Sequence, residues 1–172
     1  MWVAALQKIA FPKMNGWKQS TNPKPSSKFY INYQLSIINY QLSIMMKLDI
    51  LAFGAHPDDV ELGCGGTIAK EVALGKKVGI IDLTRGELGT RGSAEIRDLE
   101  AGAAAKLLGV STRENLNMRD GFFVNDEEHQ LAIIRMLRKY QPEIVLCNAI
   151  DDRHIDHGKG SKLVSDACFL SG

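Results

Sequence analysis

From residue 47 onward, short apolar segments alternate with segments whose apolar residues recur at helical spacing. The apolar segments have the length of strands and lack the strict polar–apolar alternation of a half-exposed strand, which favours a parallel sheet covered on both faces. Strands are expected at residues 48–55, 77–84, 115–118 and 143–149. Helices are expected at residues 59–73 and 94–108, from Asp126 to Pro142, and from Gly158 onward. The sequence therefore predicts an α/β sandwich with helices on both faces of a mainly parallel sheet.

The expected helices carry start and stop signals. Ser93 is a favourable N-cap for residues 94–108, and Pro142 cannot continue the helix that begins at Asp126. Gly75 is expected to end the helix over residues 59–73. Two helices also carry apolar residues at helical spacing: Val60, Ile68, Ala69 and Val72 are available for the inner face of the first, and Ile96, Leu99, Ala103 and Leu107 lie on one side of the second.

The first 44 residues differ in character from the rest. The segment INYQLSI at residues 31–37 is repeated without change at residues 38–44, and the only charged residues before Met45 are five lysines. We interpret residues 1–45 as a low-complexity N-terminal extension, translated upstream of a true start at Met45 or Met46 and separate from a domain over residues 46–172. The alternative is an aromatic, β-prone arm that pairs with a partner.

Charge and hydropathy limit the classes of partner that this protein is expected to bind. The other 16 basic residues and all 20 acidic residues lie at positions 45–172, which gives this part a net charge of −4. A mildly acidic domain offers no electrostatic reason to bind nucleic acid. No segment approaches the ~20 apolar residues of a membrane span. We therefore expect neither nucleic acid nor a membrane as partner.

The cysteines indicate the redox compartment. Cys64, Cys147 and Cys168 are far apart, lack CxxC spacing and have apolar neighbours. This usage is typical of a reduced protein whose thiols are buried in the core rather than acting as ligands or nucleophiles. Residues 1–11 also lack the charged start and sustained apolar stretch of a secretory signal. A cytoplasmic location is expected.

Two motifs that combine histidine with carboxylates follow expected strands. HPDD at residues 56–59 comes directly after the first strand, and HIDH at residues 154–157 follows the fourth. Polar segments also follow the second and third strands, at residues 85–91 and 119–120. Ligands of such sheets bind beyond the carboxyl ends of the strands, so we expect these segments to meet at one edge.

The two motifs together would provide a metal site. His56, Asp59 and His157 would give two imidazoles and one carboxylate, which leaves one position of a tetrahedral zinc open for water. Bound zinc lowers the pKa of such a water to about 7 and polarises a carbonyl. Histidine and aspartate suit iron(II) as well, so zinc is the expected cofactor and iron(II) the alternative.

The remaining residues of the motifs are candidates for catalysis. Asp58 is not needed as a ligand and is free to act as general base toward the water. His154 can point at the same site, stabilise an oxyanion and protonate a leaving amine. Asp156 is placed to orient one of the imidazoles. The pattern predicts a metal-dependent hydrolase.

Each motif taken alone also has a simpler interpretation. HPDD suits a helix N-terminus, HIDH suits a polar loop, and Arg97 on an expected helix suits a solvated charge as well as a substrate contact. The glycines Gly63, Gly65 and Gly66 superficially resemble a dinucleotide-binding loop, but Ile68 stands where the fingerprint requires its last glycine. A nucleotide-binding Rossmann domain is thereby disfavoured, and the glycines are expected to allow close packing of their helix.

Residues 46–172 resemble the PIG-L-type (LmbE-like) zinc deacetylases, which remove acetyl groups from N-acetylglucosamine derivatives. The motifs that carry the resemblance are AHPDDVELGCGGT at residues 55–67 and DDRHIDHGKG at residues 151–160. LTRGELGTRGSAEIR at residues 83–97 is most similar to the bacillithiol-biosynthesis branch, whose enzymes deacetylate N-acetylglucosaminyl malate. The resemblance implies a Rossmann-like three-layer sandwich, zinc-dependent N-deacetylation and a homo-oligomer, because relatives often form hexamers.

The resemblance also implies a role for each candidate residue. The roles are metal ligand for His56, Asp59 and His157, general base for Asp58, oxyanion-stabilising histidine for His154 with Asp156 as its carboxylate partner, and substrate contact for Arg97.

The sequence departs from the family pattern in two places. Ile155 replaces the proline commonly found between the histidine and the aspartate. The chain ends at Gly172, where relatives continue for roughly another half-domain, so the C-terminal part of the sandwich is expected to be missing. The alternative to an active deacetylase is therefore a catalytically incompetent, metal-binding fragment of one.

Overall fold

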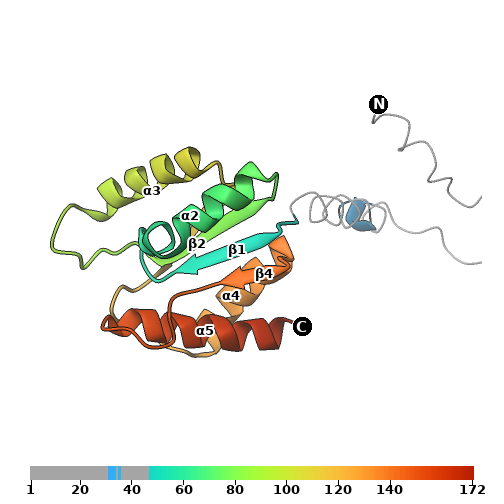
Figure 1. Cartoon of the computed structure of the whole chain (residues 1–172). Coiled ribbons are helices and arrows are strands. Elements are labelled where there is room, and N and C mark those ends of the chain that lie inside the picture. Colours follow the sequence, from blue (N-terminus) through green and yellow to red (C-terminus); the bar gives the residue numbers. More distant parts are fainter. Residues whose placement is uncertain (1–30, 34, 36–46) are drawn as a thin grey trace, which may run out of the picture. The chain divides into compact units, whose positions relative to one another are not determined.

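The computed structural model describes residues 31–33, 35 and 47–172. Residues 47–172 contain a four-stranded parallel sheet in the order β3-β2-β1-β4 (Figure 1). The strands are β1 (Ile50–Gly54), β2 (Val78–Thr84), β3 (Thr112–Met118) and β4 (Ile144–Leu146). Ile50 of β1 is in register with Val78 of β2 and with Ile144 of β4. The predicted parallel sheet is confirmed, and β1 lies between β2 and β4.

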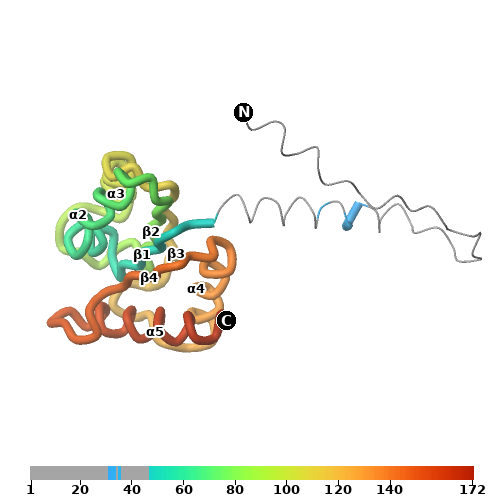
Figure 2. The backbone as a smooth tube through the Cα atoms, turned by 45° about the vertical axis from the view of Figure 1, so that its right-hand side comes forward, coloured from blue at the N-terminus to red at the C-terminus, as the bar shows by residue number. Residues whose placement is uncertain are grey.

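Helices cover both faces of this sheet. Helices α2 (Asp59–Ala73) and α3 (Ala94–Leu108) lie on one face, and α4 (Glu127–Tyr140) and α5 (Ile155–Ser171) lie on the other (Figures 1 and 2). All five residues of β1 and all seven of β2 are buried. Burial on both faces explains why these strands read as continuous apolar runs.

The alternation of side chains along β1 produces two cores. Leu51 and Phe53 belong to a cluster with residues of α4 and α5, whereas Ile50 and Ala52 belong to a cluster with Val60 and other residues of α2. Successive side chains of a strand point to opposite faces, so one apolar strand supports both helical layers. The three-layer sandwich follows directly from this arrangement.

Two helix boundaries confirm the capping signals of the sequence. The Ser93 side chain accepts a hydrogen bond from the backbone N–H of Ile96. The Asp126 side chain accepts one from the backbone N–H of His129, 3.0 Å away. Helix α4 ends at Tyr140, two residues before Pro142, as expected from a residue without a backbone N–H.

Other boundaries differ from the expected ones. Helix α5 begins at Ile155 rather than near Gly158, so the second half of the HIDH motif lies in its first turn. The cap is unusual, because the His154 ring accepts a hydrogen bond from the backbone N–H of Asp156. Strand β3 starts three residues earlier than expected, and β4 is shorter than the apolar segment that contains it.

The apolar stripe on α3 is not covered in the described part of the chain. Ile96, Leu99 and Leu107 are 49%, 75% and 90% exposed, and the buried residue of this helix is Ala101. The carbonyl of Ala101 accepts a hydrogen bond from Arg113, which also forms a buried ion pair with Asp82 of β2. Helix α3 thus meets the rest of the fold through Ala101, the partly buried Leu108 and a polar network, while the three residues of the stripe are exposed.

Two further expectations about α2 were wrong. Ala69 is exposed rather than on the inner face. A Cβ atom added at Gly63 or Gly66 would meet nothing within 4 Å, so these glycines do not provide close packing. Gly65 is buried, as are Val60 and Ile68. The inner face of α2 is therefore narrower than its apolar periodicity indicated.

The expectation of buried thiols was also wrong in part. Cys147 is exposed, because it follows β4 at the edge of the described sheet, and Cys64 and Cys168 are half-buried. Burial raises the pKa of the Cys64 and Cys168 thiols. No thiol of these three is fully enclosed.

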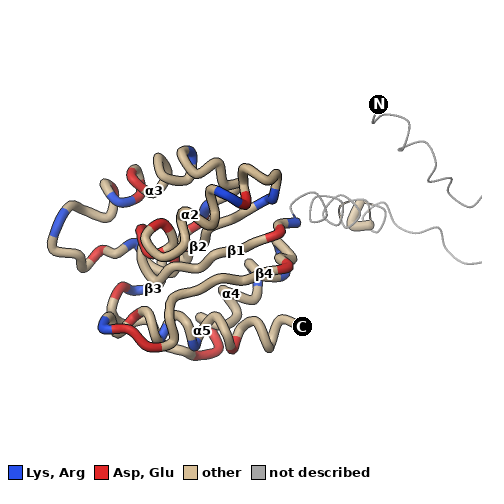
Figure 3. Tube along the Cα trace, viewed as in Figure 1, with Lys and Arg blue, Asp and Glu red and all other residues tan. Residues whose placement is uncertain are grey.

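Most of the N-terminal segment lies outside the described residues, including Met45, Met46 and the second copy of the repeat. Ile31–Tyr33 and Leu35 of the first copy are helical and exposed, which contradicts an extended, β-prone arm at these positions. Acidic and basic residues are interspersed along residues 47–172 (Figure 3). Within the described ranges, no helix is long and apolar enough to cross a membrane.

Candidate active site

The candidate site begins at the tight turn that follows β1. A Cβ atom at Gly54 would lie 3.0 Å from the His56 carbonyl oxygen and 3.2 Å from the Asp59 Cβ, so the turn requires glycine at its start. The turn is fixed from both neighbouring strands. The Thr84 hydroxyl at the end of β2 donates to the Ala55 carbonyl at 2.8 Å, and the Asn148 side chain after β4 accepts from the Ala55 N–H at 2.9 Å.

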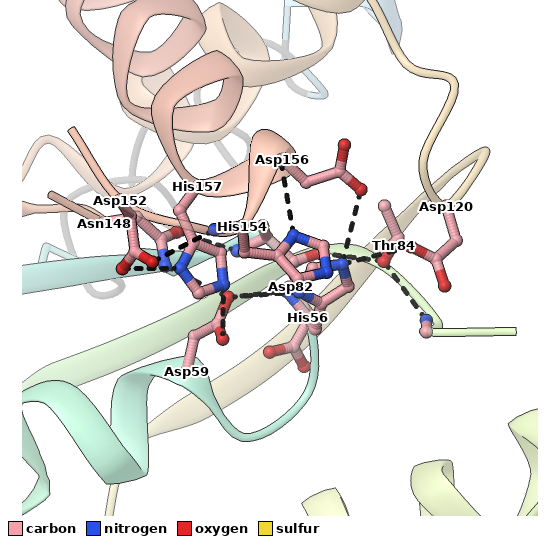
Figure 4. A network of polar contacts seen from close by, with 12 residues as sticks. His56, Asp59, Asp82, Thr84, Asp120, Asn148, Asp152, His154, Asp156 and His157 are labelled. Carbon is pink, nitrogen blue, oxygen red and sulfur yellow. Dashed lines mark hydrogen bonds and ion pairs between the residues drawn. The ribbon is translucent and has the colours of Figure 1, made fainter. Parts of the chain in front are cut away.

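The Asp59 carboxylate lies between two imidazoles, that of His56 from the turn after β1 and that of His157 from the first turn of α5 (Figure 4). Its Oδ2 is 3.5 Å from Nδ1 of His56, and its Oδ1 is 3.2 Å from Nε2 of His157. The side chains of Asp59 and His56 are 9% and 10% exposed, and that of His157 is 19% exposed. The structure thus brings together the three side chains that the sequence suggested as metal ligands.

Electrostatics keep Asp59 ionised. Burial alone would raise the pKa of its carboxyl, but hydrogen bonds from the His56 side chain and backbone and from Asn148, together with the charge of His157, lower it to about 2. Burial also opposes a charge on His56, yet Asp59 and Asp120 raise the pKa of this imidazole to about 9. A buried, ionised carboxylate beside two imidazoles is a donor set suited to a divalent cation.

Two groups of three side chains among the described residues could hold a metal by distance alone. One consists of His56, His154 and His157, and the other of His56, Asp120 and Asp156, with ligand atoms within 4.8 Å of one another in each group. His56 belongs to both. These groups adjoin the Asp59 contacts, so the whole region is dense in possible ligands.

The outward nitrogens of the two imidazoles also contact carboxylates. Nε2 of His56 is 3.0 Å from Oδ1 of Asp120, and Nδ1 of His157 is 3.0 Å from Oδ2 of Asp152. We did not select Asp120 or Asp152 as site residues from the sequence. The sequence feature that could have identified them is their position after a strand. Asp120 follows β3 in the polar segment at residues 119–120, and Asp152 lies in the motif at residues 151–160.

His154 and Asp156 lie beside the candidate ligands. The ring of His154 is 4.7 Å from that of His56 and 4.9 Å from that of His157, centroid to centroid. Asp156 contacts His154 through its backbone N–H, while its buried carboxylate accepts hydrogen bonds from the Gly121 N–H and from Lys159. The same carboxylate is 3.4 Å from Nε2 of His56. The imidazole that the Asp156 carboxylate contacts is therefore that of His56, whereas His154 is contacted by the Asp156 backbone.

A pocket of about 490 Å³ opens over these residues. Its lining includes Asp58, Arg97 and the three clustered histidines. Burial and the charge of Asp59 raise the pKa of Asp58, and the charge of Arg97 opposes this rise. The pocket therefore contains an acid–base candidate, a guanidinium and the possible metal ligands. Its lining includes residues that follow all four strands, as predicted for a ligand site of a parallel sheet.

Comparison with known proteins identifies the family. A family profile described as GlcNAc-PI de-N-acetylase, PIG-L, matches residues 51–168. The chain belongs to the PIG-L family. The resemblance based on the two histidine motifs is thereby confirmed.

Two solved structures share the fold of this PIG-L chain. A conserved protein from Thermus thermophilus is 43% identical, with a TM-score of 0.69 over 72% of this chain and 56% of that one. The N,N′-diacetylchitobiose deacetylase from Pyrococcus horikoshii is 28% identical, with a TM-score of 0.67 over 87% of this chain and 61% of that one. Both comparisons confirm the predicted α/β sandwich.

A curated relative extends the range of named substrates. The 1D-myo-inositol 2-acetamido-2-deoxy-alpha-D-glucopyranoside deacetylase of Kineococcus radiotolerans is 35% identical over 96 residues, which is 47% of this chain and 27% of that protein. The present chain thus spans less than two thirds of the length of each of these relatives.

The pocket wall depends on a glycine whose replacement we expect to destabilise the fold. Gly86 has a φ of +62°, and a Cβ atom there would collide with the Arg97 guanidinium. We expect Gly86→Ala to lower the free energy of unfolding by about 1–2 kcal/mol, since an L residue is strained in this conformation. Urea denaturation measures the change.

Gly66→Ala is the matched control. Gly66 lies within α2, where an added Cβ meets open space. Alanine is the better helix former, so this substitution should raise the free energy of unfolding by about 0.5–1 kcal/mol. Equal effects of the two substitutions would contradict the role given to Gly86.

Proposed function

We propose that this protein hydrolyses the N-acetyl amide of an N-acetylglucosamine conjugate, releasing acetate and a free amine. The observation that carries the proposal is the ionised Asp59 carboxylate between His56 and His157, at a pocket that also holds Asp58 and His154. Membership of a family described as a GlcNAc-PI de-N-acetylase supports the reaction class.

We assign His56, Asp59 and His157 as ligands of a divalent metal, zinc or alternatively iron(II). Two imidazoles and one carboxylate match the three protein ligands of many catalytic zinc sites, so the residues fit the ion. When bound, such an ion would supply Lewis-acid chemistry toward the amide carbonyl and a water molecule. The position of Asp59 between the rings would allow all three side chains to face one ion.

The other side chains would move protons and stabilise charge. Asp58 would take a proton from a water molecule as the water oxygen adds to the acyl carbon. His154, in its protonated form, would donate a hydrogen bond to the acyl oxygen as negative charge develops there. Breaking of the carbon–nitrogen bond then requires a proton on the amine nitrogen, which His154 can deliver. The products are acetate and the free amine.

The metal ligands and the general base are distinguishable by substitution. In His157→Ala we expect the bound zinc, about one equivalent in the wild type, to be lost together with acetate release. In Asp58→Asn we expect zinc to be retained while kcat falls by about 10²–10⁴-fold. Zinc content by elemental analysis and acetate release measure both effects.

His129→Ala is the control for histidine removal. His129 is the one histidine of the chain outside the two motifs, and it pairs with Asp126 at the start of α4, away from the pocket. Its substitution should leave zinc content and acetate release unchanged. A wild-type protein that binds no divalent metal, or an Asp58→Asn variant with full activity, would refute the proposed mechanism.

The finer proposal concerns the substrate. We propose N-acetylglucosaminyl malate, as in bacillithiol biosynthesis, because residues 83–97 are most similar to that branch and Arg97 lies in the pocket. A guanidinium binds carboxylates well, and the malate group carries two of them. Relatives named for diacetylchitobiose and for an inositol glycoside mark the competing substrates.

An acetate-release assay on these three substrates tests the choice. We expect the highest kcat/KM for N-acetylglucosaminyl malate, and an increase of its KM in Arg97→Ala because a carboxylate partner is removed. Arg91→Ala, at an exposed position in the loop that precedes α3, serves as control. Preference for diacetylchitobiose would refute the assignment to the bacillithiol branch but not the proposed deacetylase activity. Zinc binding without acetate release from any substrate would favour the catalytically incompetent fragment.

Homo-oligomeric assembly and a cytoplasmic location stay predictions. The exposed side chains of Ile96, Leu99 and Leu107 on α3 support assembly, because isolated monomers seldom expose such a stripe. The amino-sugar substrate is a small molecule, and the interspersed charges of Figure 3 agree with that class of partner.

A further inference from the structure

The two imidazoles of the proposed metal site face Asp59 through different ring nitrogens. Each presents one nitrogen to Asp59 and the other to a second carboxylate (Figure 4). For His56 the inward nitrogen is Nδ1, and for His157 it is Nε2. The outward nitrogens face Asp120 and Asp152, each at 3.0 Å.

We infer that Asp120 and Asp152 are positioning residues, which keep the hydrogen of each metal-bound imidazole on its outward nitrogen, so that Nδ1 of His56 and Nε2 of His157 are the nitrogens offered to a metal beside Asp59. This inference rests on the proposed metal site. An ionised carboxylate only accepts hydrogen bonds, so the outward nitrogen beside Asp120 or Asp152 keeps its hydrogen when a metal occupies the nitrogen on the Asp59 side. A neutral imidazole has one N–H, and its other nitrogen is then available to a metal.

Each of these carboxylates is itself held in place. The second oxygen of Asp152, Oδ1, accepts a hydrogen bond from the His154 N–H at 3.1 Å. This bond fixes Asp152 to the segment that begins α5, the helix that carries His157. A ring and its carboxylate partner are thus anchored in one short stretch of chain.

Asp120 is anchored to a different part of the site. Its Oδ2 accepts a hydrogen bond from the Leu88 N–H at 3.0 Å, and its own N–H donates to Glu87 at 2.8 Å. Leu88 lines the same pocket as Arg97. Asp120 therefore connects the His56 ring to the loop that forms the substrate side of the pocket, whereas the described contacts of Asp152 stay with the HIDH segment.

Asp156 is the neighbour most able to substitute for Asp120. It lies 3.4 Å from Nε2 of His56, farther than Asp120, and its carboxylate is already engaged by Gly121 and Lys159. These contacts point its oxygens to other donors. Asp120 remains the shorter partner of the ring.

The test is the zinc affinity of the metal-free protein, titrated against a competing chelator. We expect Asp120→Ala and Asp152→Ala each to raise the zinc Kd by about 10–100-fold, the usual cost of removing a carboxylate behind a ligating histidine. Asp120→Asn and Asp152→Asn, which keep an acceptor oxygen, should lose less. Asp151→Ala is the matched control, since Asp151 is exposed and adjacent in sequence to Asp152.

A second readout separates the two residues. At saturating zinc, KM for the acetylated substrate should rise in Asp120→Ala, because the Leu88 anchor is lost, and this rise should be absent in Asp152→Ala. Thermal unfolding of the metal-free proteins verifies that each variant is folded. An unchanged KM in Asp120→Ala would overturn the connection to the loop.

The outcomes also separate this inference from the proposed function. If the wild type binds zinc and both folded alanine variants bind it within about twofold, the positioning role is refuted while the metal site stands. If the wild type binds no zinc, the metal site itself is refuted, and the positioning role with it.

Discussion

The contact on which the site depends is the Asp59 carboxylate held between the imidazoles of His56 and His157. An ionised carboxylate at this depth loses most of its hydration, which is unfavourable unless partners replace the water. The His56 backbone N–H at 2.9 Å and the Asn148 amide at 3.1 Å replace part of it. The two imidazoles complete the surroundings, so that the carboxylate ties the turn after β1 to the first turn of α5.

The parallel sheet makes this contact possible. His56 and His157 are far apart in sequence, but β1 and β4 are neighbours and their carboxyl ends meet at one edge. The same arrangement places Thr84 and Asn148 on either side of the turn and lets both hydrogen-bond to Ala55. Hydrogen bonds from the neighbouring strands therefore hold the backbone of the turn independently of any ligand. Such support is the usual requirement for a precise metal or catalytic site.

Much of this was predictable from the sequence because the decisive signals are local. Apolar strands, the Ser93 cap and the two motifs each lie within a few residues, and the rule for parallel sheets joins the motifs in space. The contacts of Asp120 and Asp152 were not predictable in this way, since a carboxylate after a strand does not reveal which ring it faces. Periodicity likewise located the apolar stripe of α3 but could not show that Ala101 and the Arg113 ion pair would occupy its inner side.

The most direct test of the central claim is the position of the metal in a crystal of the zinc-loaded protein, located by anomalous scattering at the zinc absorption edge. We expect a single strong peak between Nδ1 of His56, the Asp59 carboxylate and Nε2 of His157, at about 2.0–2.2 Å from each ligand atom. A peak on the other side of the His56 ring, between Asp120 and Asp156, or no peak in this region, would contradict the account.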